Sequence, residues 1–199
     1  MRVSFTRLTR VPSNCGCERW RTLRLVLTLS YSYPHSILVG AVETVTIRGV
    51  AARLLTEEAR KRDMGLEEYV LELVTRHLDP KDRAREYVKV ARELLEEAEE
   101  ELGRGGVRQA AEKICGAAAL TVKAYAFWRE GRRLASHSQL WEYSLTVARE
   151  LGEWVREAWF AAVSMHTCFY EGWCGREHIE GALKIVGKLV EAVAEKLLE

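Results

Sequence analysis

Proline is scarce in this sequence. Only three prolines occur among 199 residues, and all of them precede residue 81. A proline inside a helix removes a backbone hydrogen bond and clashes with the preceding turn. The rest of the chain is therefore free to be helical.

An excess of charge of either sign is also missing. The chain has 30 Lys and Arg against 29 Asp and Glu, a formal net charge of +1. This balance excludes a strongly basic protein that packages nucleic acid. The contents of 48% apolar and 30% charged residues are typical of a soluble globular protein and exclude disordered and collagen-like chains.

The sequence has no long apolar run without interruption. The segment 25–42 carries no Asp, Glu, Lys or Arg, but Pro34 and His35 interrupt it. A helix that spans a membrane needs about 20 mostly apolar residues. We therefore expect no membrane insertion and no signal peptide, and we expect the protein to be cytoplasmic.

The first forty residues differ in composition from the rest. They contain six arginines, no lysine and a single acidic residue, Glu18. This composition predicts a poorly structured basic leader over residues 1–41. The alternative is that translation begins further along, between Val39 and Glu43.

Residues 42–79 predict a small unit of one strand and two helices. Polar and apolar residues alternate over residues 43–48, as in a strand, and apolar residues then recur at helical spacing on both sides of Gly65. This order resembles the ribbon-helix-helix fold, in which paired strands place side chains in the DNA major groove. The outward side chains of the strand would be Thr44, Thr46 and Arg48. The sequence thus allows DNA binding through residues 43–78, or a helical hairpin that simply packs on the rest.

Residues 80–199 predict four amphipathic helices. Apolar stripes indicate helices near residues 84–102, 107–130, 137–169 and 179–197. Asp79 is a good N-cap, and Pro80 suits the first helical position. Short connections favour antiparallel neighbours, so we expect a mostly α protein with an up-and-down four-helix bundle.

Several separated motifs carry a family resemblance. They are Ala91 to Ala98, Arg108 to Lys113, Ser136 to Trp141 and Met165 to Gly172. Together they resemble the archaeal PaREP family, a branch of the HEPN helical-bundle superfamily, over roughly residues 50–199. HEPN proteins are often dimers and include ribonucleases, toxin components and nucleotide-associated proteins. The resemblance therefore implies a homodimeric module that binds nucleotide or RNA and is related to toxin–antitoxin or defence systems.

The resemblance leaves a metal-independent ribonuclease as an alternative. Ribonucleases of the superfamily carry Arg followed, four to six residues later, by His near the start of the fourth helix. Arg132 and His137 have this spacing but lie between the predicted second and third helices, not near the fourth. His166 and His178 lack an Arg at the required distance upstream.

One candidate catalytic group is His166, Tyr170 and Glu171. His166 and Tyr170 are four residues apart and share a helical face, with Glu171 adjacent. A histidine beside a carboxylate acts as a general base, and a tyrosine donates a hydrogen bond to developing charge. The alternative is a buried polar network near a helix end.

A candidate phosphate site surrounds His137. Arg132 and Arg133 precede it, and guanidinium groups bind phosphate through paired donors. The alternative is structural: Ser136 caps the helix, and His137 holds the loop.

Lys113 and Lys123 extend the candidate nucleotide- or RNA-binding set to the Ala-rich second helix of the bundle. Their positions predict a nucleotide pocket in the groove of the bundle. The alternative is an internal ion pair centred on Glu112, because buried charges need partners.

The five cysteines leave two alternatives near the end of the third bundle helix. His166, Cys168, Cys174 and His178 have the residue types of a zinc site, whereas Cys168 and Cys174 alone would form a disulfide. The spacing is not that of a standard zinc finger. We expect no metal and no cofactor.

Overall fold

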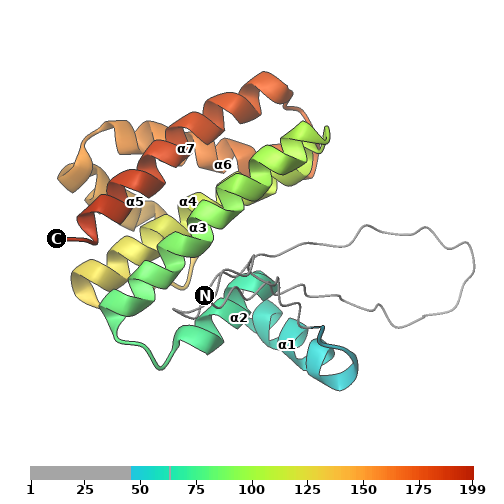
Figure 1. Cartoon of the computed structure of the whole chain (residues 1–199), viewed down its shortest axis with the longest axis vertical. Helices are drawn as coiled ribbons and strands as arrows, with labels where there is room; N and C mark the ends of the chain where they lie inside the picture. The colour runs from blue at the N-terminus through green and yellow to red at the C-terminus, as the bar shows by residue number, and fades with distance from the viewer. Residues whose placement is uncertain (1–45, 63) are drawn as a thin grey trace, which may run out of the picture. The chain divides into compact units, whose positions relative to one another are not determined.

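The computed structural model describes residues 46–62 and 64–199, and all the regular elements in these ranges are helices. The chain divides into two compact units between Leu73 and Val74. The first unit contains α1 (Gly49–Lys61) and most of α2 (Leu66–Thr75), and the second contains α3 to α7 (Figure 1). None of the helices in the described ranges is long and apolar enough to cross a membrane. The predicted mostly α class is confirmed.

The predicted strand-helix-helix unit is not supported. Residues 46–48 form no strand, and α1 begins directly after Arg48, while residues 43–45 and the predicted leader 1–41 lie outside the described residues. A strand of this length needs a hydrogen-bonded partner strand, and the described part of the chain offers none. The two predicted helices are present, but residues 46–48, which would carry two of the three outward side chains for DNA binding, form no strand.

Helix α3 (Pro80–Gly103) begins where the sequence predicts. The Asp79 carboxylate accepts hydrogen bonds from the backbone N–H groups of Lys81, at 2.9 Å, and Asp82, at 3.1 Å. Pro80 occupies the first turn, where its missing N–H costs no helical hydrogen bond. The N-terminal boundary of the bundle is thus set by a local Asp-Pro signal.

Helix α4 (Val107–Glu130) lies at the centre of the second unit and packs against α3, α5, α6 and α7. Six of its alanines are completely buried: Ala110, Ala111, Ala117, Ala118, Ala124 and Ala126. A Cβ added at Gly116 would lie 3.3 Å from Leu94 Cδ1 of α3. Small side chains on α4 therefore allow the neighbouring helices to approach closely.

The predicted long helix over residues 137–169 is wrong, because the chain breaks it in two. Helix α5 (His137–Leu151) ends at Gly152, and α6 (Trp154–Glu171) follows. Gly152 has φ +114° and ψ 155°, a conformation that is essentially restricted to glycine. The Trp154 indole N–H donates to the Leu151 carbonyl at 2.9 Å across this corner. The second unit accordingly has five helices instead of four.

Helices α3, α4, α6 and α7 (Arg176–Lys196) form an antiparallel four-helix bundle. Arg108 at the start of α4 bonds the end of α6, and Arg176 at the start of α7 bonds the Leu102 carbonyl at the end of α3. Helices α3 and α7 lie side by side in Figure 1, and Arg92 of one forms a hydrogen-bonded ion pair with Glu191 of the other, at 2.8 Å from Nε. Helix α5 lies outside this four-helix bundle and packs against α4 and α6.

Helix α5 runs antiparallel to α6 and in the same direction as α4. His137 at its start lies beside His166 in the second half of α6, and Glu150 at its end accepts a hydrogen bond from Tyr125 near the end of α4, at 2.6 Å. Residues 131–136 must therefore run back along the bundle before α5 begins. Leu134, only 3% exposed, anchors this connection in the core. The expectation that this connection joins antiparallel neighbours is wrong.

The corner at Gly152 provides a test of the break between α5 and α6. A Gly152→Ala variant should lose about 1–3 kcal/mol of unfolding free energy, because an L side chain rarely adopts this backbone conformation. Its Cβ would also lie 3.0 Å from Trp154 Cδ1. Urea unfolding followed by circular dichroism measures the change.

A Gly181→Ala variant is the matched control. Gly181 lies in α7 with nothing within 4 Å of an added Cβ, so alanine there should be neutral or stabilise the helix by about 0.5–1 kcal/mol. Equal stability of the Gly152→Ala and wild-type proteins would contradict the strained corner.

Candidate functional site

Three side chains predicted from different motifs meet on α5 and α6. The ring centroids of His137 and His166 are 6.0 Å apart, and those of His166 and Tyr170 are 5.0 Å apart. All three residues are exposed, and Tyr170 retains 65% of its accessible surface. We call these three residues the ring cluster. Because it faces solvent, the alternative of a buried polar network at this position is wrong.

The start of α5 is fixed by local hydrogen bonds. The Ser136 hydroxyl accepts from the Gln139 backbone N–H at 3.3 Å, and the Gln139 side-chain oxygen accepts from the Ala135 N–H at 2.6 Å. The predicted Ser136 cap is confirmed. The cap places His137 in the first helical position, where its ring meets the ring of His166.

The end of α6 is held by an arginine from α4. Arg108 Nε donates to the Phe169 carbonyl at 2.7 Å, and Nη2 donates to the Tyr170 carbonyl at 3.1 Å. The last four carbonyls of a helix have no partner within the helix, and a cation there also interacts favourably with the helix dipole. Arg108 thus fixes the turn that carries Tyr170. Arg108 lies within one of the family motifs, but nothing in the sequence pattern indicates this role.

Partial burial lowers the pKa of His166 below the ordinary value of 6.5, and the neighbouring His137 lowers it further. Two imidazoles this close disfavour simultaneous protonation. His166 therefore favours the neutral form, in which one ring nitrogen accepts a proton.

Arg132 and Arg133 lie, exposed, in the connection that leads into α5. The Arg132 guanidinium lies 5.7 Å from the centroid of the Tyr143 ring. Glu171 is the last residue of α6 and is exposed. Glu171 follows His166 by five positions, which places them about 140° apart around the helix, so Glu171 does not share the face of the ring cluster.

Lys113 and Lys123 lie elsewhere on α4. Lys113 forms an ion pair with Glu97 of α3, and their side chains are only 17% and 14% exposed. Lys123 is 7% exposed. The structure therefore uses Lys113 in an internal ion pair and does not present either lysine as an open ligand site.

Cys168 and Cys174 form a disulfide, with Cα atoms 5.5 Å apart. The disulfide alternative is confirmed, and the zinc alternative is wrong because paired cysteines are not thiolate ligands. His178 Nδ1 accepts a hydrogen bond from the Gly175 N–H at 3.1 Å. No group of three or more His, Cys, Asp or Glu within the described ranges is arranged to hold a metal ion. Burial raises the pKa of the free Cys115 thiol to about 11, so this thiol is a poor nucleophile.

The helices that build this site fall within a known family. The model of the archaeal PaREP1/PaREP8 family matches residues 86–190, more than half of the chain. The chain belongs to this family. The matched range contains the whole ring cluster, Arg108 and the disulfide, so the PaREP resemblance predicted from the motifs is confirmed.

The PaREP chain was also compared with solved structures and with curated proteins. A solved crystal structure of a Sulfolobus solfataricus protein is 26% identical and covers 55% of this chain and 97% of its own, with a TM-score of 0.49. None of the curated proteins compared with the chain matches it.

An exposed apolar patch adjoins the ring cluster in the PaREP chain. Trp141, one helical turn after His137, is 40% exposed, and its ring lies 5.8 Å from those of Trp159 and Phe160. Leu145 and Phe160 are 44% and 55% exposed. We call Trp141, Leu145 and Phe160 the aromatic patch. Helical spacing alone does not predict which tryptophans face the core and which face the surface, because the break at Gly152 decides which face is covered.

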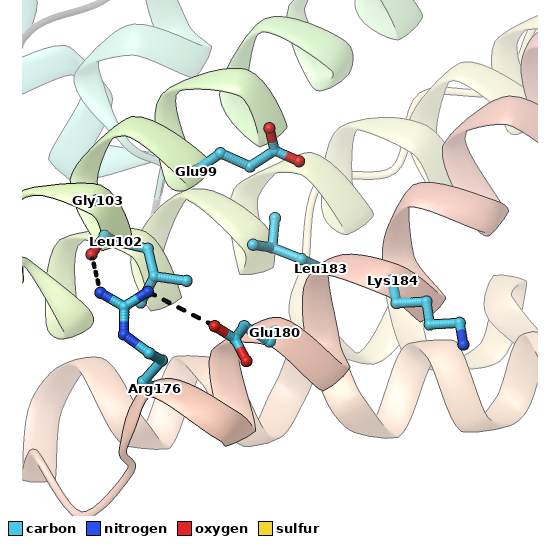
Figure 2. A pocket seen from close by; sticks show the side chains of 7 residues that line it. All are labelled: Glu99, Leu102, Gly103, Arg176, Glu180, Leu183 and Lys184. Carbon is cyan, nitrogen blue, oxygen red and sulfur yellow. Dashed lines mark hydrogen bonds and ion pairs between the residues drawn. The ribbon is translucent and has the colours of Figure 1, made fainter.

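A groove of about 420 Å³ lies between the end of α3 and the first half of α7 (Figure 2). Its lining includes two acids, two cations and two leucines: Glu99, Glu180, Arg176, Lys184, Leu102 and Leu183. Arg176 already donates to the Leu102 carbonyl at 2.8 Å and lies 3.5 Å from Glu180. The lining of the groove therefore carries both positive and negative side chains, and Arg176 is already occupied by contacts within the protein. The groove favours no class of ligand.

The ring cluster predicts a measurable titration. His166 should titrate below pH 6.5, and a His137→Ala substitution should raise its pKa, because a neighbouring positive charge is removed. The folded pKa is below the unfolded one, so the stability contributed by the neutral ring is present above pH 6.5 and declines as the pH falls through the folded pKa. Imidazole NMR signals across pH 4–9 measure the pKa.

The exposed His77, which lies outside the cluster, provides the matched control for this titration. A His77→Ala substitution should leave the His166 titration in place. A His166 pKa at or above 6.5, or one that His137→Ala does not move, would contradict the proximity of the two rings.

Proposed function

We propose that this protein is a HEPN-like helical interaction module that binds nucleotide or RNA, and that the ring cluster holds a phosphate of the ligand. The observation that carries the proposal is the approach of His137 to His166, with 6.0 Å between exposed ring centroids. An anion bound between the two imidazoles would favour their protonated, positively charged forms. The resemblance to the HEPN superfamily is what suggests the ligand class.

Groups around the cluster support an anionic ligand. His137 opens α5, and the first N–H groups of a helix favour a phosphate. The exposed Arg132 and Arg133 lie in the connection that precedes α5. Tyr170 adds a hydroxyl donor that solvent can reach. The site thus combines donors from two helices and one connection.

The proposal includes a homodimer in the cytoplasm, in a toxin–antitoxin or defence setting. The aromatic patch supports an association surface, because large exposed apolar groups are enriched in interface cores. It lies beside the ring cluster, so a second copy seated on the patch would border the proposed phosphate site.

Ligand binding is tested with a 5′-labelled single-stranded oligoribonucleotide, followed by fluorescence anisotropy. A His137→Ala/His166→Ala double variant should weaken binding at least about tenfold, because each hydrogen bond to a charged group contributes about 1.5–3 kcal/mol. A His77→Ala variant removes an exposed histidine outside the cluster and should bind like wild type. Equal affinity of all three proteins would rule out the cluster as the site.

A second candidate function, metal-independent RNA cleavage, is favoured by the lowered pKa of His166. A neutral His166 would accept the proton of a ribose 2′-hydroxyl, and His137 would act as the general acid that donates one to the leaving 5′-oxygen. Tyr170 would hydrogen-bond the charge that develops on the phosphate.

Cleavage is tested by incubating mixed RNA with the wild-type protein and with a His166→Ala variant in the presence of EDTA. The wild type should shorten the RNA, and the variant should be at least about 100-fold slower, the usual contribution of general base catalysis. An oligonucleotide that lacks the 2′-hydroxyl should remain intact. Equal cleavage by both proteins, or none by either, would remove this function.

A further inference from the structure

The disulfide lies at the end of α6 that carries the proposed site. Cys168 is in the last turn of α6 and is completely buried, whereas Cys174 is half-buried in the turn to α7. Cys168 is two residues from both His166 and Tyr170. The covalent loop that the disulfide closes contains Tyr170 itself.

The chain reverses direction inside this loop. Gly172 adopts φ +71° and its N–H donates to the Cys168 carbonyl at 2.8 Å. Trp173, next along, is 48% exposed, and its ring lies 5.3 Å from that of His178. The last turn of a helix frays readily because its carbonyls lack partners within the helix. The disulfide opposes that fraying by tying the last turn to the residue that precedes α7 by two positions.

A second, non-covalent restraint acts on the same turn. Arg108 of α4 holds the carbonyls of Phe169 and Tyr170. The two restraints approach from different directions, since Arg108 acts from the neighbouring helix and the disulfide acts along the chain. We therefore expect that removal of the disulfide leaves α6 folded and allows its final turn to open more often.

From this arrangement we infer that the Cys168–Cys174 disulfide is a redox-sensitive clip that controls ligand affinity by holding Tyr170 beside His166. The effect on affinity rests on the proposed function, whereas the clip itself does not. When the disulfide is reduced, the last turn of α6 frays, Tyr170 leaves the His166 ring, and the phosphate site loses one of its donors.

The reductant is a dithiol, either a small molecule or a protein. Its thiolate attacks the sulfur of Cys174, the more exposed partner, and Cys168 leaves as a thiolate that takes up a proton. The second thiol of the reductant then attacks the mixed disulfide and releases Cys174. Two electrons and two protons pass to the cysteine pair, and the reductant leaves as a disulfide.

The test compares oxidised and dithiothreitol-reduced full-length protein carrying Cys15→Ser and Cys17→Ser, so that no other cysteine pair reacts. Alkylation followed by intact mass should count two additional thiols after reduction. Amide hydrogen exchange in peptides that cover residues 166–176 should become faster, while exchange in α3 stays constant. Affinity for the labelled oligoribonucleotide should fall roughly 3- to 10-fold.

Two variants act as controls. Cys174→Ala, chosen because Cys168 is fully buried, should exchange like the reduced protein and should not respond to dithiothreitol. Cys115→Ala removes a cysteine outside the pair and should respond like the parent. Unchanged exchange after confirmed reduction overturns the clip, and faster exchange with unchanged affinity overturns its control of binding. Faster exchange in a protein that binds no RNA in either state would support the clip and overturn the proposed function.

Discussion

Close helix packing around α4 is the constraint on which the rest of the structure depends. The buried alanines of α4 leave room for backbones to approach, and their burial removes apolar surface from water on several sides of one helix. A helix surrounded in this way has little surface left for charged groups, which is why Lys113 forms an ion pair with Glu97. The exposed side chains of the ring cluster accordingly lie on α5 and α6.

Two of the bundle helices, α3 and α6, end in the same kind of contact with an arginine from a neighbouring helix. Arg108, at the start of α4, binds carbonyls at the end of α6, and Arg176, at the start of α7, binds the Leu102 carbonyl at the end of α3. In each case a guanidinium from one helix satisfies acceptors that the other helix leaves open. The antiparallel arrangement makes this exchange feasible, because it places the beginning of one helix beside the end of its neighbour. The ring cluster depends on the first of these contacts.

Much of the bundle could be predicted from local patterns. Apolar periodicity identified α3, α4 and α7, and the Asp79-Pro80 pair identified the first boundary. Gly152 was missed because a single glycine does not reveal its φ angle, and the apolar stripe continues on both sides of it. The direction of α5 was missed because a connection as short as residues 131–136 favours antiparallel neighbours, whereas here it runs back along the bundle. His166 and Tyr170 were predicted as neighbours from helical spacing, whereas the approach of His137 depends on that direction.

The antiparallel pairing of α3 with α7 also bears on how the polypeptide could be reconnected. Pro80 opens α3 and Lys196 closes α7, so both ends of the bundle segment lie at the same end of two adjacent helices. Domains whose termini are neighbours tolerate circular permutation. A short linker from Glu199 to Asp79, with new termini in the exposed turn at Gly105, would preserve every helix of the bundle while reordering the chain.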